Sequence, residues 1–387
     1  MSVGRVELHF HGDTVAAGNH HNLSAVRVEG DVLWLAGDET ATLERLVLDD
    51  ALAPTRGDGQ RTYSLADLVD LPGPPDEEVD LEGLARAGDW LWTIGSHSLV
   101  RKRIKPRHSE GKAYKRLAKV RREPNRFVIA RLAVQADADG RPEPVRAADD
   151  GRRSALVGAP GSENLADLLV DDEHLAPFLA IPSKDNGLDV EGLAVRRSHP
   201  PRASSAGPSV PQDSLYVGLR GPVLRGWAVV LEVLPVDDGP GRLALGAFPD
   251  GSRYRKHVLD LDGLGVRDLC PDGDDLLVLA GPSMALSGPV RVYRWHGAAV
   301  TDTGRIVRGR ELTRELDLLH GEGVDHAEGI ALLDPAAAQR LLVVYDSPAP
   351  ARRPSEHTVV ADTLPLVPLV ARNGSAVAQR VTPDSVP

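Results

Sequence analysis

The sequence predicts an all-β fold, and more narrowly a single β-propeller of five blades closed by pairing of its N- and C-terminal strands. Two observations lead to this prediction. A short motif followed by an apolar run returns along the chain, and such repeats are typical of solenoids and propellers. In addition, glycine (38) and proline (30) are plentiful in the 387 residues while aromatic residues make up only 4%, which fits many short strands joined by turns.

The repeated motif places a polar residue near the start of an apolar strand, with a second apolar strand after it. It occurs in "VDLEGLARAGDWLWTIGSHS" from Val79, "LDVEGLAVRR" from Leu188 and "DHAEGIALLD" from Asp325. Two further copies lie in "NLSAVRVEGDVLWLAGDE" and "VRDLCPDGDDLLVLAGPS". The key positions of the copies are Ser24, Glu82, Glu191, Asp268 and Glu328.

Each copy is followed by an apolar run that predicts a third strand, at residues 42–49, 126–134, 227–236, 289–295 and 357–364. Fourth strands are predicted at residues 62–71, 256–264 and 313–320. The last copy has no fourth strand after it, and "RVELHF" at residues 5–10 can supply one. This exchange would remove the exposed sheet edges of an open array.

The propeller is expected to span residues 1–370, with a loose tail at 371–387 and a helix at 162–180. A sixth blade between Arg101 and Asp185 is the alternative. We favour five blades because that region reads as one strand, a basic insertion and the helix.

The basic insertion, residues 101–126, holds twelve Lys/Arg and two Glu, a local charge of +10. The whole chain has a net charge of −11, so the remainder carries about −21. "KAYKRLAKVRR" places Tyr114, Leu117 and Ala118 at helical spacing, which predicts a short basic amphipathic helix. The insertion is either a solvated segment that pairs with the acidic body, or an arm or lid for an anionic ligand or partner.

Composition restricts the partners and the compartment. The N-terminus lacks an apolar signal region, no stretch of eighteen apolar residues occurs, and Cys270 is the single cysteine. These features predict a cytoplasmic protein without a membrane segment. The net charge disfavours nucleic-acid binding except through the basic insertion, and the expected partner is a small anionic ligand or a protein. The sequence makes no prediction of the oligomeric state.

Side chains two apart on a strand share a face, so the repeats predict an acidic ring around the propeller axis. Its expected members are Asn22, Ser24, Asp80, Glu82, Asp189, Glu191, Asp268, His326 and Glu328. Several carboxylates in a narrow space need compensation, either from a divalent cation or from arginine. Ca²⁺ suits mixed oxygen ligands, and Arg220 in "GLRGP" can neutralise Glu191.

Two histidines near the expected ring, His97 and His326, are candidates for proton transfer, because histidine titrates near neutral pH. An alternative explanation of the repeated acidic residues is structural. Each can accept hydrogen bonds from the neighbouring blade, and each histidine can be a hydrogen-bonded rim residue without a catalytic role.

Two stretches carry a resemblance to a known family. "NGLDVEGLA" followed by "LYVGLRGP", and "DLEGLA" followed by "TIGSHS" and the basic insertion, resemble the bacterial DUF3616 family of unknown function. The resemblance extends from about Asn22 to Ser347 and implies a propeller-like repeat fold.

More distantly, the Glu-Gly strand starts are similar to the SMP-30/gluconolactonase-like, paraoxonase-like and esterase-like phytase propellers. In those families a glutamate at one strand start joins Asn and Asp residues from other blades around Ca²⁺. The similarity implies that Glu82 or Glu191 is that glutamate, with Asn22 and Asp268 as partners.

The leading functional hypothesis is a cation-dependent hydrolase of a small ester, lactone or phosphoester. Glu82, Glu191, Asp268 and Glu328 would hold the metal, His326 or His97 would move the proton, and Arg220 would hold an anionic group. The alternatives are a non-catalytic binding propeller with a structural acidic ring, and an arm that contacts nucleic acid or another polyanion.

Overall fold

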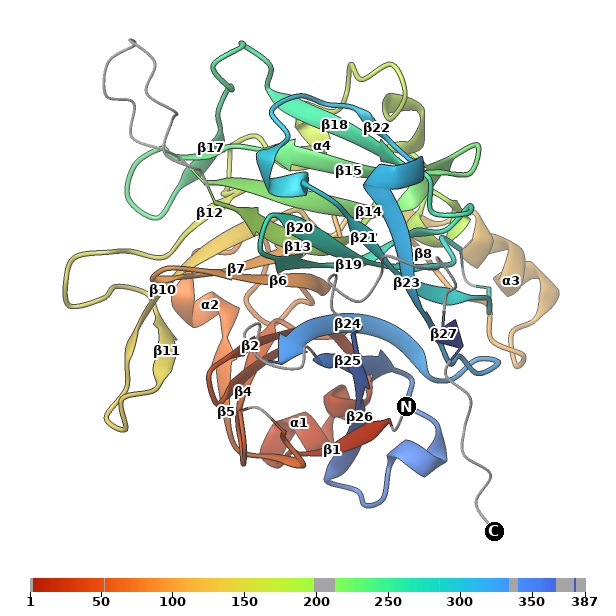
Figure 1. Ribbon diagram of the computed structural model, residues 1–387. Coiled ribbons are helices and arrows are strands. Elements are labelled where there is room, and N and C mark those ends of the chain that lie inside the picture. Colours follow the sequence, from red (N-terminus) through yellow and green to blue (C-terminus); the bar gives the residue numbers. More distant parts are fainter. Residues whose placement is uncertain are drawn as a thin grey trace.

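The chain folds mostly into β-strands, which are arranged in antiparallel four-strand units (Figure 1). The computed structural model describes residues 3–51, 53–197, 213–284, 286–333, 340–366 and 379–380. The predicted tail at 371–387 therefore lies outside the described residues except for one short strand.

Each unit begins with a strand that carries one copy of the repeat. The first consists of β2 (Leu23–Glu29), β3 (Val32–Gly37), β4 (Thr42–Leu48) and β5 (Arg56–Ser64). The second consists of β6 (Leu81–Ala87), β7 (Trp90–Gly95), β10 (Ile129–Ala136) and β11 (Pro142–Val145), with β12 (Ala155–Val157) also paired to β10. The third consists of β13 (Asp189–Arg196), β14 (Ser214–Leu224), β15 (Trp227–Val233) and β18 (Tyr254–Leu259), and β22 (Ile306–Val307) pairs with β18.

The remaining units complete the sheets. The fourth consists of β19 (Gly265–Asp272), β20 (Asp275–Gly281), β21 (Val290–Trp295) and β23 (Leu312–Leu318), beside which lies β27 (Gln379–Arg380). The last consists of β24 (His326–Leu333), β25 (Arg340–Asp346), β26 (Thr358–Pro365) and β1 (Gly4–His9). Outside the units lie β8 (Val100–Arg101), β9 (Val120–Arg121), β16 (Pro235–Asp237), β17 (Leu243–Leu245), and the helices α1 (Gly12–Ala16), α2 (Leu65–Leu68), α3 (Glu110–Leu117) and α4 (Leu165–Leu168).

The two ends of the chain meet in one sheet. β1 pairs antiparallel with β26, as the sequence predicted for residues 5–10 and 357–364. β1 also pairs in parallel with β5, so the first and last units form one eight-stranded sheet. The end strands of this sheet, β2 and β24, contact each other, which nearly closes it.

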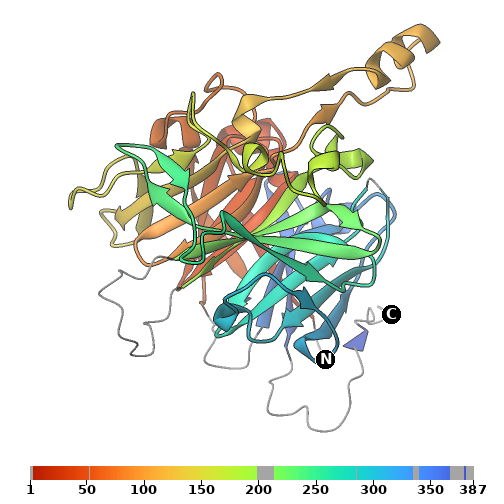
Figure 2. The same cartoon turned by 90° about the horizontal axis from the view of Figure 1, so that it is seen from above.

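The first strands of the units form a closed cycle of contacts, from β2 to β6, β13, β19, β24 and back to β2. The hydrophobic core is divided in the same way, because each buried cluster lies between neighbouring units. Trp34 of the first unit and Leu132 of the second share one cluster, and Tyr216 of the third and Trp295 of the fourth share another. The sheets are thus packed face to face around the cycle (Figure 2).

Tight hairpins connect the first two strands of several units. Gly30-Asp31 and Gly88-Asp89 are two-residue loops, since Glu29 pairs with Val32 and Ala87 with Trp90. Both glycines have positive φ, as a type II′ hairpin turn requires at its first central position. These turns fix the register of the first strand against the second.

The glycine of the Glu-Gly motif is required by close packing between neighbouring units. A Cβ atom added to Gly83 would lie 2.7 Å from Leu193 Cβ, and one added to Gly192 would lie 2.9 Å from Leu269 Cγ. Both distances are too short for two carbon atoms in contact. The glycine therefore lets first strands of adjacent units approach closely, and the residue before it supplies the polar side chain of the motif.

Two predicted elements differ from the structure. The fourth strand expected at 62–71 is β5, which runs from Arg56 to Ser64. Residues 65–68 form the helix α2 instead of continuing the strand. Within 162–180, helical structure is limited to the single turn α4 and a 3₁₀ turn at Ala176–Phe178. No helix in the described part of the chain is long and apolar enough to cross a membrane.

A buried ion pair fills the middle of the cycle. Arg27 of β2 donates to both carboxylate oxygens of Asp268, at 2.9 and 3.0 Å. Its guanidinium also donates to the carbonyl oxygens of Leu193, Leu269 and Ile330, which belong to three other first strands. Asp268 in turn accepts from the backbone N–H of Ile330 at 2.9 Å. The pair therefore links four of the first strands.

We predict that Asp268→Asn lowers the free energy of unfolding by about 3 kcal/mol, because it leaves the buried Arg27 charge without a counter-ion. Urea denaturation at pH 7 measures this loss. The matched control is Asp58→Asn, whose pair with Arg56 is 54% exposed on both sides and should change stability by no more than about 0.5 kcal/mol. Equal effects of the two substitutions would contradict a central role for Asp268.

Candidate functional site

One end of the cycle gathers most of the polar residues expected from the repeats. In every first strand the register against the second strand skips one residue near the strand start. The skipped residues are Ser24, Glu82, Glu191, Arg267 and Glu328. We call this end the axial mouth, and it comprises Asp38, Asp80, Glu82, Asp189, Glu191, Arg220, Arg267, His326, Glu328 and Asp346.

Asp268 does not belong to the axial mouth, which corrects its assignment as a metal ligand. The residue of β19 that corresponds to Glu82 and Glu191 is Arg267, and Asp268 takes the place of the glycine that follows. Its carboxylate is fully buried and is occupied by Arg27 and backbone N–H groups. Residue type alone groups Asp268 with the glutamates, whereas the strand register groups Arg267 with them.

Two arginines neutralise one half of the axial mouth. Arg220 lies against Glu191, as predicted, and its Nη1 is 3.9 Å from Asp189 Oδ2. Arg267 pairs with Glu328 and lies 3.2 Å from the second oxygen of Glu191. Glu191 is therefore held between two arginines. Because Arg220 is only 5% exposed and already paired, it is not free to hold a substrate.

The other half of the axial mouth lacks such compensation. Glu82 is only 8% exposed. Among the described residues, none donates a hydrogen bond to its carboxylate or forms an ion pair with it. Burial, and then the charges of Asp80 and Glu191, raise the pKa of Glu82 well above its usual range. Burial, and then Glu328 and Asp80, raise the pKa of Asp38 to about 9.

Asp38, Asp80 and Glu82 lie together. One carboxylate oxygen from each lies within 4.8 Å of the other two, which suits a shared cation. Asp80 forms an ion pair with Arg126, which also pairs with Glu78. Among the described residues, Arg126 is the only cation that forms an ion pair with any of these three carboxylates. We call these three residues the acidic trio.

A second group of possible ligands lies on the last unit. One ligand atom from each of His326, Glu328 and Asp346 falls within 4.8 Å of the others, and His326 Nδ1 is 3.6 Å from Asp346 Oδ2. The side chain of His326 is 35% exposed, so it is open to solvent. Asn22, the expected amide ligand, forms a backbone bridge with Asp346 and so lies at the same end.

His97 lies outside both groups of possible ligands. It is 1% exposed, its Nδ1 is 2.8 Å from the carbonyl oxygen of Gly95, and its ring packs edge-on against Phe127. Burial lowers the pKa of His97 to about 4. A side chain this buried cannot exchange protons readily with a substrate, which leaves His326 as the accessible histidine of the original pair.

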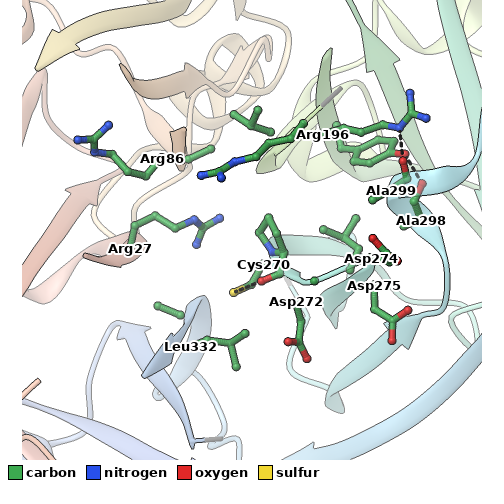
Figure 3. A pocket seen from close by; sticks show the side chains of 18 of the residues that line it. Arg27, Arg86, Arg196, Cys270, Asp272, Asp274, Asp275, Ala298, Ala299 and Leu332 are labelled. Carbon is green, nitrogen blue, oxygen red and sulfur yellow. Dashed lines mark hydrogen bonds between the residues drawn. The ribbon is translucent and has the colours of Figure 1, made fainter. Parts of the chain in front are cut away.

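The opposite end of the first strands opens into a cavity of about 630 Å³ (Figure 3). Its wall includes Arg27, Arg86, Arg196, Asp272, Asp274 and Asp275, and Figure 3 shows the arginines and aspartates on different sides. The guanidinium of Arg86 pairs with Glu29, and that of Arg196 pairs with Glu232 and Asp302.

Cys270 also lines this cavity, and burial raises the pKa of its thiol to about 11. It is therefore a thiol rather than a nucleophilic thiolate at neutral pH. Because Arg27, Arg86 and Arg196 already have protein partners, we place the candidate site at the axial mouth rather than at this cavity.

Comparison with known proteins identifies the family. A family model described as a protein of unknown function, DUF3616, matches residues 22–362. This chain belongs to the DUF3616 family. The match confirms the resemblance seen in the sequence, and the more distant similarities stay predictions. A search of curated proteins found no match.

Among solved structures, the glutaminyl cyclase of Myxococcus xanthus aligns with this DUF3616 protein with a TM-score of 0.38 and 12% identity. The alignment covers 95% of this chain and 100% of that chain. A similarity at this level carries no argument about function.

Three residues in or beside the axial mouth were not predicted from the sequence. Arg267 lies next to Asp268, and an alignment of "VRDLC" with "VEGLA" by their apolar residues pairs Arg267 with the glutamate. Arg126 and Glu78 are far from the repeat motif, and only folding brings Arg126 from the end of the basic insertion to Asp80. No local pattern in the sequence indicates that contact.

The pKa of His97 predicts a loss of stability in acid. The unfolded chain takes up a proton near the ordinary histidine pKa of 6.5, and the folded protein takes it up only near 4. Folding stability is therefore complete above pH 6.5 and falls as the pH decreases toward 4, by on the order of 3 kcal/mol.

Substituting His97→Asn should make this decrease shallower, and asparagine also tolerates the positive φ of this position. Urea denaturation at several pH values between about 4 and 7 measures the slope. His320→Asn, at an exposed histidine, is the control and should leave the slope unchanged. A slope that is equally steep with and without His97 would show that another group causes the acid sensitivity.

Proposed function

We propose that this DUF3616 protein is a five-bladed propeller that binds a divalent cation, Ca²⁺ above others, at the axial mouth. We further propose that it uses the bound cation to hydrolyse a small ester, lactone or phosphoester. The cyclic contacts of β2, β6, β13, β19 and β24, with a core cluster between each pair of neighbours, support five blades rather than six. The basic insertion and α4 then lie outside the blades.

The observation that carries the cation site is Glu82. A carboxylate that is 92% buried, without a hydrogen bond or counter-ion among the described residues, must bind either a proton or a cation. Asp38 and Asp80 supply further oxygen ligands within 4.8 Å, and hard divalent cations prefer such oxygens. The residues present therefore fit Ca²⁺ without any nitrogen or sulfur ligand.

A cation held by the acidic trio would polarise a carbonyl or phosphoryl oxygen and lower the pKa of a bound water. His326 is the accessible group for moving the proton, because it is open to solvent and lies beside Asp346. Lys184 is exposed, and its charge acts on Asp80 and Asp189, so it is better placed than Arg220 to attract an anionic substrate.

A non-catalytic propeller with a structural charge ring is the second candidate. It is favoured by Glu191 and Glu328, whose carboxylates are already neutralised by Arg220 and Arg267. That half of the axial mouth links neighbouring units and needs no metal. The two candidates differ in whether Glu82, which pairs with no arginine in the described part of the chain, binds a cation.

Metal removal distinguishes these candidates. In excess EDTA at pH 8, Glu82→Gln should have a higher Tm than the wild type. A carboxyl at this buried position beside Asp80 and Glu191 costs free energy at pH 8, whether it is ionised or takes up a proton on folding, and glutamine avoids that cost. Addition of Ca²⁺ at about 100 times its Kd should raise the wild-type Tm by roughly 5 °C and leave the variant unchanged.

Glu143→Gln is the matched control, because Glu143 lies on β11, away from the axial mouth, near Arg61. It should retain the wild-type response to Ca²⁺. If the wild type shows no shift with Ca²⁺, Mg²⁺ or Mn²⁺, the cation site is refuted and the structural ring is favoured.

Hydrolysis is tested with a lactone, a nitrophenyl ester and a nitrophenyl phosphate. We expect turnover of one of these that EDTA abolishes and Ca²⁺ restores. His326→Asn should lower kcat about 100-fold, as expected for loss of a proton-transfer group, while the Ca²⁺-induced rise in Tm persists. A Tm response without turnover of any substrate would support cation binding and contradict the hydrolase.

A further inference from the structure

The basic insertion forms a separate arm. β8 and β9 pair as a short two-stranded stem, and α3 lies at its far end (Figure 2). The backbone of the arm is held in shape by its own arginines, since Arg101 and Arg116 donate to the carbonyl oxygens of Leu117 and Arg103. No residue of α3 is buried. We call residues 101–126 the basic arm.

Most cations of the basic arm have no carboxylate partner. Arg101 pairs with Asp185, and Arg126 pairs with Glu78, Asp80 and Glu123. In the part of the chain that the structure describes, no ion pair involves the remaining ten: Lys102, Arg103, Lys105, Arg107, Lys112, Lys115, Arg116, Lys119, Arg121 and Arg122. The expectation that the arm pairs with the acidic body thus applies only at its two ends.

The unpaired cations are crowded. Slight desolvation, and then the charges of Arg121, Lys119 and Arg116, lower the pKa of Lys102. Desolvation, and then Arg116, Lys112 and Lys105, lower the pKa of His108. A polyanion with closely spaced charges would relieve this repulsion, whereas a single carboxylate would meet only one or two of the cations.

The apolar side chains of the arm favour one class of polyanion. Tyr114 is 68% exposed, while Ile104, Leu117 and Val120 are only 37–43% exposed. An exposed tyrosine ring among cations can stack on a base. Binding to an anionic membrane needs a broad apolar face, whereas each of these three aliphatic side chains is more than half buried.

A second copy of the chain is also a poorer partner than a polyanion. Many carboxylates of the body are already paired with arginines of the body, for example Asp137 with Arg45 and Asp362 with Arg352.

We propose that the basic arm binds the phosphodiester backbone of a nucleic acid without sequence specificity. The contact is made by Lys and Arg of the arm with phosphates, and Tyr114 stacks on an accessible base. This function is separate from the axial mouth and does not depend on a cation there.

The test is fluorescence anisotropy of the full-length protein with a labelled random-sequence single-stranded DNA, whose bases are accessible, measured over a series of salt concentrations. We expect log K to fall linearly with log salt. The double variant Lys112→Gln with Lys115→Gln removes two exposed cations and should reduce the magnitude of the salt slope by about 1.4. Lys112→Arg with Lys115→Arg keeps the charge and should keep the slope.

Arg308→Gln with Arg310→Gln is the matched control, because both arginines are exposed on the body and the charge change is the same. It should bind like the wild type. Equal loss in the control and in the arm variant would overturn the proposal, because binding would then follow net charge alone.

Three other results would also overturn the proposal. These are no salt-sensitive binding of the single-stranded DNA, binding to vesicles with phosphatidylserine but not to DNA, and self-association that the arm variant abolishes while DNA is not bound. Because α3 is exposed, the arm variants should keep the wild-type Tm, which separates loss of binding from loss of folding.

Discussion

The contact between Arg27 and Asp268 is the interaction on which the rest of the structure depends. Buried backbone carbonyl oxygens need hydrogen-bond donors, and one side chain here serves several first strands. Arg27 supplies several N–H groups at once and reaches strands β13, β19 and β24 from β2. Asp268 supplies the matching negative charge. The pair also separates the axial mouth from the cavity at the other end, since Arg27 lines that cavity.

The Glu-Gly repeat combines two requirements in adjacent residues. Glycine allows the first strands of neighbouring units to approach, as at Gly83 against Leu193. The residue before it is the one that the strand register skips, so its side chain is free to lie in the axial mouth. Three of the five copies keep both the glutamate and the glycine. In the other two the skipped residue is Ser24 or Arg267, and Ala25 or Asp268 stands in place of the glycine.

Strand positions could be predicted from the sequence because they depend on local alternation and on turns. The third strands at 42–49 and 227–236 and the pairing of the two termini follow from apolar patterns alone. The site was predictable only in part. Asp80 and Glu82 lie close together, and Arg220 meets Glu191, as the sequence predicted. The positive φ of Asp80 and the skipped register at Glu82 were not predicted. The contacts of Arg126 and the burial of His97 depend on how distant segments pack, and no periodicity reports them.

The axial mouth is asymmetric in charge, and this asymmetry separates structure from function. Where Arg220 and Arg267 lie between carboxylates, the charges cancel within the protein and join the third, fourth and last units. Near Asp38 and Glu82, no described arginine forms an ion pair with either carboxylate, although burial makes the ionised form of both unfavourable. A purely structural ring has no reason to leave this sector unneutralised, since an arginine at the position of Ser24 would supply a cation to the same ring. The missing charge is what a bound cation would provide, and it would act beside the solvent-exposed His326.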